Sequence, residues 1–251
     1  MARKTKRKTA AKPKTTRKPA PAALHKEHFP GESKAYRAAR NDLLKAEMKL
    51  RREIEAVAAL RRKLPPGGAI PEDYEFEEGG ADLADTETVR RVKMSDLFQR
   101  DASLVVYSYM YGPAMAKACP MCTSILDTLD RTVQHAGQRI NVVVVAKSPI
   151  QRIRALARER GWRNLRLLSS AGNRYNLDYR GETAQGSQRP ALNVFARKDG
   201  NIHHTWCSEL MFAPSEAGQD PRHVDVMWPL WNLLDVTPEG RGTDWRPRLA
   251  Y

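Results

Sequence analysis

Two cysteines separated by two residues stand between an apolar run and an amphipathic pattern, and this order constrains the fold more than any other feature of the chain. The motif is Cys119-Pro120-Met121-Cys122, and the apolar run spans residues 103–110. Cysteines at this spacing close a disulfide ring only where the backbone turns sharply, as in the first turn of a helix. Proline suits that turn because its φ is already helical and its missing N–H would have had no intrahelical partner. The sequence therefore predicts a strand followed by a helix, with Cys119 at the cap and Cys122 one turn inside.

This placement predicts a reactive thiol at Cys119. The free N–H groups and dipole of a helix start place about half a positive charge beside the sulfur. A thiol pKa of about 8.5 falls to between about 3.5 and 7.5 in such positions. Cys119 is then the attacking thiolate and Cys122 the resolving thiol. The motif also fits two buried structural cysteines or half of a zinc site, although three cysteines in the chain exclude a four-cysteine site within one molecule.

The third cysteine, Cys207, follows two histidines on a predicted strand. A metal site formed by Cys119, Cys122, Cys207 and one histidine is chemically reasonable. Strand alternation weakens it, because His203 and Cys207 then share one face while His204 points away. We predict no metal, and interpret Cys207 as a buried thiol or an accessory redox residue.

The rest of the chain alternates between strand-like and helix-like patterns. The β-branched run at 140–146 is typical of a strand covered on both faces. Asp199-Gly200 indicates a tight hairpin turn. The expected elements after the dithiol are a helix at 120–136, a strand at 140–146, a helix from Pro149 to about Arg160, a short strand at 165–168, a hairpin at 191–206 and a helix near 221–234. This is the order of a thioredoxin-like α/β fold, with a central mixed sheet flanked by helices.

In such a fold the proline before the hairpin strand usually lies cis and presents backbone to the substrate. Pro190 occupies that position. We expect a cis bond there, with an ordinary trans proline at a strand start as the alternative. The predicted substrate-binding residues are Pro190, Pro120 and Met121. The arginines of the helix ending near Arg160 are interpreted as a solvated face.

The N-terminal part predicts three organisational units: a disordered basic tail over 1–30, a long helix within 31–68, and the thioredoxin-like domain over 69–251. The helix is expected from Ser33 to a Pro-Pro-Gly-Gly stop, with a heptad-spaced apolar stripe. The stripe fits packing on the domain or on a second copy of the chain. Residues 69–101 are expected to form a short hairpin or an extended arm.

Charge and hydropathy bound the partners and the compartment. Residues 1–30 carry ten Lys or Arg against the single acidic residue Glu27, within a net charge of +14 for the chain. The tail predicts weak, non-specific polyanion binding or merely a solubilising extension. No secretory h-region follows the basic residues, and no stretch approaches a membrane span. We therefore expect a cytoplasmic protein without membrane association, in which a C-x-x-C pair is catalytic rather than a structural disulfide.

Several blocks together resemble an uncharacterised bacterial and fungal family described as thioredoxin-like, predicted dithiol-disulfide oxidoreductases. The resemblance covers roughly residues 34–251 and implies both the fold and the activity. It departs in the tail, in Met121 and in Cys207. The matching blocks are Arg61-Arg62-Lys63-Leu64-Pro65, Asp73-Tyr74-Glu75-Phe76, Leu97-Phe98, Tyr109-Met110-Tyr111-Gly112-Pro113, the dithiol, residues 169–179, residues 234–241 and Tyr251.

The sequence thus predicts a thiol-disulfide oxidoreductase that acts on a protein or small-molecule disulfide and needs no cofactor. One alternative is a peroxiredoxin-like peroxide reductase, in which Cys119 forms a sulfenic acid that condenses with Cys122. Another is a non-enzymatic module, stabilised by zinc or serving as an adaptor. The sequence predicts neither the electron donor nor the oligomeric state.

Overall fold

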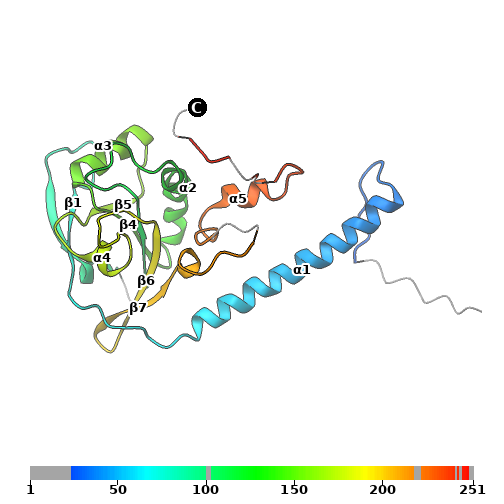
Figure 1. Cartoon of the computed structure of the whole chain (residues 1–251), viewed down its shortest axis with the longest axis horizontal. Helices are drawn as coiled ribbons and strands as arrows, with labels where there is room; N and C mark the ends of the chain where they lie inside the picture. Colours follow the sequence, from blue (N-terminus) through cyan, green and yellow to red (C-terminus); the bar gives the residue numbers. More distant parts are fainter. Residues whose placement is uncertain (1–23, 100–102, 218–221, 241, 243–244, 249–251) are drawn as a thin grey trace, which may run out of the picture. The chain divides into compact units, whose positions relative to one another are not determined.

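The computed structural model describes residues 24–99, 103–217, 222–240, 242 and 245–248 (Figure 1). The chain divides into two compact units, the first ending at Arg62 and the second beginning at Lys63. Most of the predicted tail, residues 1–23, lies outside the described residues, as do Arg241 and Tyr251.

Helix α1 (Lys34–Arg62) forms where the sequence predicts it. The Ser33 hydroxyl accepts a hydrogen bond from the N–H of Tyr36 at 3.1 Å, which satisfies one of the free donors at the helix start. The helix ends shortly before the first of two consecutive prolines, since a residue preceding proline disfavours helical backbone. The apolar stripe is exposed, Leu50 and Ile54 each at 60%. The partner of this stripe stays a prediction.

The second unit contains a seven-stranded mixed sheet in the order β2-β1-β5-β4-β3-β6-β7. Strands β3, β4 and β5 are parallel to one another, whereas β6 is antiparallel to β3 and β7 antiparallel to β6. The strands are β1 (Glu75–Gly79), β2 (Val89–Lys93), β3 (Leu104–Ser108), β4 (Asn141–Ala146), β5 (Arg166–Ser169), β6 (Ala191–Lys198) and β7 (Asn201–Cys207).

The strand order identifies the fold as thioredoxin-like. Its core is a β3-α2-β4 crossover joined to the antiparallel hairpin β6–β7, with β3 lying between β4 and β6. The dithiol follows β3, the first core strand. The helices are α2 (Pro120–Ala136), α3 (Ile150–Arg160), α4 (Tyr175–Asp178) and α5 (Pro229–Leu234), with 3-10 turns at Met94–Leu97 and Glu209–Met211. The predicted fold class is confirmed.

Two hydrophobic clusters lie on opposite faces of the sheet. The first packs α2, α3 and α5 together and includes Tyr107, Cys122 and Leu192. The second lies around α4 and includes Tyr175 and Phe195. The strands β3, β4 and β6 contribute side chains to both clusters, because alternate residues of a strand point to opposite faces. The sheet therefore separates the core beneath α2 from the core around α4.

The segment predicted as a hairpin or an arm is a hairpin that belongs to the sheet. Strands β1 and β2 pair along their whole length, and β1 joins the sheet through Glu77 and Glu78, paired with Ser169 and Leu168 of β5. Phe76 of β1 and Tyr74 just before it are buried in the second cluster, which explains why this acidic stretch docks rather than remaining an arm.

The β6–β7 hairpin turns at Asp199 and Gly200, both with positive φ, as the Asp-Gly signal predicts. A bulge between Val194 and Phe195 of β6 and the facing residues of β7 shifts the register. As a result His204, not His203, shares the face of Cys207. The prediction from strict alternation was wrong because an extra residue in one strand reverses the facing of everything beyond it.

The predicted C-terminal helix near 221–234 is shorter than expected. Helix α5 covers only Pro229–Leu234, and the described residues before it form turns. Trp228 and Trp231 anchor this segment to the first cluster, with ring centroids 5.1 Å apart. No helix in the described part of the chain is both long and apolar enough to cross a membrane.

Candidate functional site: the dithiol at the start of α2

The two cysteines lie where the motif predicts them. Cys119 has extended backbone and is the N-cap of α2, Pro120 occupies the first turn, and Cys122 lies one turn inside. The N–H of Cys119 donates to the Met110 carbonyl at 3.1 Å, which ties the helix start to the end of β3. Cys119 is partly exposed, Cys122 is 2% exposed, and both are free thiols. The Cys119 sulfur can therefore contact a partner molecule, whereas the Cys122 sulfur is buried.

The environment pushes the pKa values of the two thiols apart. A hydrogen bond from the Cys122 thiol is the largest cause that lowers the pKa of Cys119, to about 6. Burial opposes it, and the backbone N–H groups of Cys122 and Met121 add to it, as expected at a helix start. The pKa of Cys122 is raised well above its usual value by its interaction with Cys119 and by burial. Near neutral pH the pair therefore has one thiolate, at Cys119.

The loop between β3 and α2 is held by Arg152, the third residue of α3. Its guanidinium donates to the carbonyls of Gly112 at 3.2 Å and Ala116 at 3.2 Å, and also to that of Met115. The same group lies over the Tyr111 ring, 4.3 Å from the centroid. Arg152 thus fixes the backbone that delivers Cys119 to the helix cap.

The expectation that the α3 arginines form only a solvated face was wrong. Arg154 is 8% exposed and donates to the carbonyls of Gly80 and Asp82. Arg160 pairs with Asp127 of α2. Carbonyl acceptors leave no signal in the sequence, which is why periodicity could not distinguish these arginines from solvated ones.

Pro190 lies at the same end of the sheet as the dithiol. It directly precedes Ala191, whose partner across the ladder is Ser108, the last residue of β3. Two residues later, the Met110 carbonyl accepts the hydrogen bond from the N–H of Cys119. The peptide bond before Pro190 is trans, as are all others in the described residues, so the expected cis bond is wrong. The loop that precedes Pro190 is closed by a hydrogen bond from the N–H of Arg189 to the Gly181 carbonyl at 2.8 Å.

Cys207 lies on the opposite face of the sheet from the dithiol. It is paired with Asn193, whose side-chain oxygen accepts a hydrogen bond from Nε2 of His204 at 2.9 Å. Burial raises the pKa of Cys207. The sheet thus stands between Cys207 and Cys119, and no three His, Cys, Asp or Glu side chains in the described ranges gather closely enough to hold a metal ion. The four-ligand site considered above does not form.

The sequence matches the family described as bacterial protein of unknown function (DUF899) over residues 26–251. The chain belongs to this family. That assignment confirms the resemblance inferred from the sequence blocks. No curated protein matches the chain at a significant level.

This DUF899 chain is also similar to solved structures of a peroxiredoxin, a peroxidoxin and a thioredoxin. A 2-Cys peroxiredoxin of Plasmodium vivax aligns with a TM-score of 0.44 and 15% identity, covering 68% of this chain and 96% of its own. Peroxidoxin BcpB of Mycobacterium tuberculosis gives 0.40 and 19%, covering 66% and 94%. The exposed lipoprotein thioredoxin Etrx1 of Streptococcus pneumoniae gives 0.37 and 14%, covering 62% and 98%. The fold assignment rests on the strand order of this DUF899 sheet.

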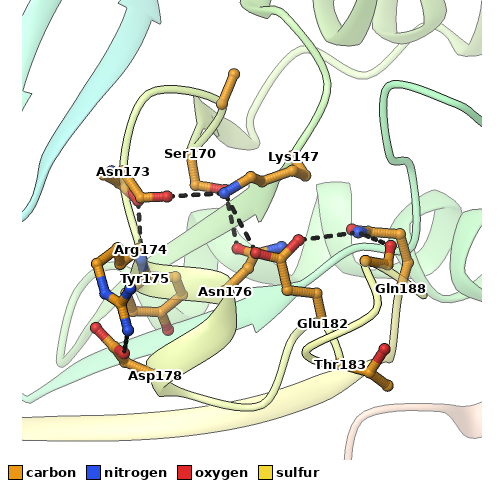
Figure 2. A network of polar contacts seen from close by, with 12 residues as sticks. Lys147, Ser170, Asn173, Arg174, Tyr175, Asn176, Asp178, Glu182, Thr183 and Gln188 are labelled. Carbon is orange, nitrogen blue, oxygen red and sulfur yellow. Dashed lines mark hydrogen bonds and ion pairs between the residues drawn. The ribbon is translucent and has the colours of Figure 1, made fainter.

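A polar network in this DUF899 protein supports the loop that ends at Pro190 (Figure 2). Lys147 reaches between Asn173 and Glu182, donating to the Asn173 carbonyl at 2.7 Å and pairing with Glu182 at 3.3 Å. The buried Asn176 accepts from the Ser170 hydroxyl at 2.9 Å. The Asn173 side chain likewise accepts from the N–H of Tyr175 at 3.0 Å, so both asparagines stabilise loops. Nothing in the sequence paired Lys147 with Glu182, because thirty-four residues separate them.

Proposed function

We propose that this protein is a thiol-disulfide oxidoreductase whose attacking group is the Cys119 thiolate. The observation that supports this most strongly is the divided pair: a partly exposed thiol with a pKa of about 6 above a buried thiol whose pKa is raised. A structural cysteine pair has no use for such a division. An exchange catalyst needs it, because the first sulfur must be ionised and the second must remain protonated until it is required.

The proposed reaction proceeds in two displacements. The Cys119 thiolate attacks one sulfur of a disulfide R–S–S–R′, forms a mixed disulfide with R, and releases R′S⁻, which takes a proton from water. Cys122 then loses its proton to solvent, and its thiolate attacks the Cys119 sulfur. The Cys119–Cys122 disulfide forms, and RS⁻ leaves and is protonated. The substrate gains two electrons and the dithiol loses two, so a separate reductant must restore the protein.

Three residues are proposed to hold the substrate. Pro120 is exposed and Met121 partly exposed directly beside Cys119, and Pro190 approaches from β6 at the same end of the sheet. None of them carries a charge, so they provide backbone carbonyls and apolar surface rather than an ion pair. This surface fits an uncharged stretch of a protein disulfide better than a charged small molecule.

The test is equilibration of the full chain in buffers of reduced and oxidised dithiothreitol, followed by thiol trapping and peptide mass spectrometry. We expect a reversible Cys119–Cys122 bond, absent in Cys119→Ser. Cys207→Ser serves as the matched control and should leave the bond and its midpoint unchanged. The proposal is wrong if Cys119 and Cys122 stay reduced throughout the series while a control dithiol protein oxidises.

A peroxide reductase is the second candidate, favoured by the same low pKa of Cys119, because sulfenic acid formation also needs a thiolate. Hydrogen peroxide would then oxidise Cys119 to a sulfenic acid with release of water, and Cys122 would condense with it and release a second water. The peroxide reductase is supported if low-micromolar peroxide oxidises the protein stoichiometrically within seconds while disulfides react slowly. Faster reaction with disulfides than with peroxide would support disulfide exchange.

A further inference from the structure

The hydroxyl of Tyr107 is buried without an ordinary hydrogen-bond partner. Tyr107 lies in the middle of the sheet on β3 and is 0% exposed. Its oxygen makes no hydrogen bond of standard geometry to any described residue. Burying a hydroxyl without a hydrogen bond costs free energy, so phenylalanine would fill this position at lower cost. The hydroxyl is therefore available to donate to a neighbouring group that becomes charged.

The resolving cysteine, Cys122, is the thiol with which this hydroxyl interacts most strongly. Tyr107 and Cys122 belong to the same cluster beneath α2. The pKa of Cys122 is raised by its interaction with Cys119 and by burial, and the Tyr107 hydroxyl acts on it in the opposite direction. Burial raises the pKa of Tyr107 itself, with Cys122 the next cause. The phenol therefore stays protonated and can donate.

The neighbouring tyrosine shows that this arrangement is specific to Tyr107. The Thr123 hydroxyl donates to the Cys119 carbonyl at 2.9 Å, so in its 2.7 Å contact with Tyr109 the phenol must be the donor. The Tyr109 proton is thus directed to Thr123. Of the described tyrosines that interact with both cysteines, Tyr107 and Tyr109, the Tyr107 phenol is the one whose proton is not directed to another hydroxyl.

We propose that Tyr107 is the catalytic hydrogen-bond donor that stabilises the Cys122 thiolate during resolution of the mixed disulfide; this rests on the exchange reaction proposed above. In the resting protein Cys122 keeps its proton and directs it to Cys119. Once Cys119 is bonded to the substrate sulfur, Cys122 releases its proton to solvent. The Tyr107 O–H then donates a hydrogen bond to the new Cys122 thiolate. An electron pair of this thiolate attacks the Cys119 sulfur and displaces RS⁻. Tyr107 keeps its own proton throughout.

Removal of this donor should slow the second displacement and leave the first nearly unchanged. A hydrogen bond to a charged group contributes about 1.5–3 kcal/mol, which corresponds to a tenfold to hundredfold effect on the rate. We therefore expect Tyr107→Phe to slow resolution at least about tenfold. Its pH dependence should also move to higher pH, because the thiolate of Cys122 forms less readily. Cys119, Tyr107 and Tyr109 are the titratable groups with which Cys122 interacts in the described structure.

The experiment uses the full-length protein and dithiobis(nitrobenzoic acid), which releases one coloured thiolate for each displacement. Stopped-flow mixing separates attack by Cys119 from resolution by Cys122, and Cys122→Ser identifies the first phase. The matched control is Tyr175→Phe, because Tyr175 is also 0% exposed with an unpartnered hydroxyl but lies in the other cluster. Urea unfolding should show both phenylalanine variants at least as stable as the parent protein.

The expected result is a slowed, alkaline-shifted second phase in Tyr107→Phe only. An unchanged second phase in Tyr107→Phe overturns the role of Tyr107 while the exchange reaction stands. Equal slowing in Tyr107→Phe and Tyr175→Phe would mean a general loss of packing and would overturn it as well. If the parent protein shows no second phase at all, the proposed exchange reaction itself fails.

Discussion

The pH dependence of Cys119 gives the sharpest quantitative expectation. With a pKa of about 6, Cys119 is about 90% thiolate at pH 7, whereas an ordinary thiol of pKa about 8.5 is about 3% thiolate. The ratio of ionised fractions is therefore about 30 at pH 7. It rises to about 240 at pH 5.5, where the ordinary thiol is about 0.1% ionised. The low pKa favours Cys119 most strongly in acid.

A lower pKa also makes the thiolate a weaker nucleophile. With a Brønsted slope of about 0.4–0.5, a difference of about 2.5 pKa units reduces intrinsic reactivity about 10- to 18-fold. Cys119 should then react with a disulfide only about twofold to threefold faster than the ordinary thiol at pH 7, but about 13- to 24-fold faster at pH 5.5. Above pH 9 it should be about tenfold slower. The pH–rate profiles of Cys119 and of the ordinary thiol must therefore cross at about pH 7.4.

The assay is the first phase of dithiobis(nitrobenzoic acid) reduction in Cys207→Ser, compared with a small thiol of ordinary pKa over pH 5 to 9. Cys122→Ala is the informative variant, since the Cys122 thiol is the largest cause of the lowered pKa. Its midpoint should move to higher pH and its reactivity in alkali should increase. A parent midpoint near 8.5, or profiles that never cross, would refute the electrostatic reasoning.

Four further expectations concern other parts of the molecule. The reduction potential of the dithiol should fall by about 59 mV per pH unit below about pH 6 and by about 30 mV above it, since a thiolate at Cys119 removes one proton from the couple; a single slope across this range would contradict the split titration. Arg152→Leu should lower the free energy of unfolding in urea by about 1–3 kcal/mol, with little rescue by lysine, which lacks the planar fork; full rescue would show that charge alone suffices. Asp130→Ala should cost about 3 kcal/mol in the same assay because the carboxylate accepts from the N–H groups of three consecutive residues, 163–165; a loss below about 1 kcal/mol would contradict this. We also propose that residues 1–30 bind polyanions: binding to heparin should weaken steeply with salt and disappear when these residues are removed, with disulfide exchange unchanged, whereas retained binding would assign it elsewhere.

The sequence was sufficient for the parts of the fold that local chemistry controls. The helix of residues 120–136 was predicted to the residue, because a proline and a capping position define its start and glycine follows its end. The turn at Asp199-Gly200 was equally secure, since both residues accept positive φ. The placement of Cys119 and Cys122 followed from the same local rules.

The errors arose where distant residues decide the outcome. The bulge in β7 depends on how that strand meets β6, and it moved His204 onto the face of Cys207 against simple alternation. The role of Arg152 depends on carbonyl groups about forty residues away, and that of Tyr107 depends on its shared cluster with Cys122 of α2. No periodicity encodes contacts of this kind.

The coupling between the two thiols sets the order of the proposed steps. In the resting protein the hydrogen bond that Cys122 donates to the Cys119 thiolate is what most strongly keeps the proton on Cys122. When Cys119 becomes part of a mixed disulfide, its charge disappears, and the largest barrier to ionisation of Cys122 disappears with it. Burial remains, and the Tyr107 hydroxyl offsets part of it. The resolving thiol is thus inactive before the first displacement and becomes active because of it, while the sheet keeps Cys207 from competing for the intermediate.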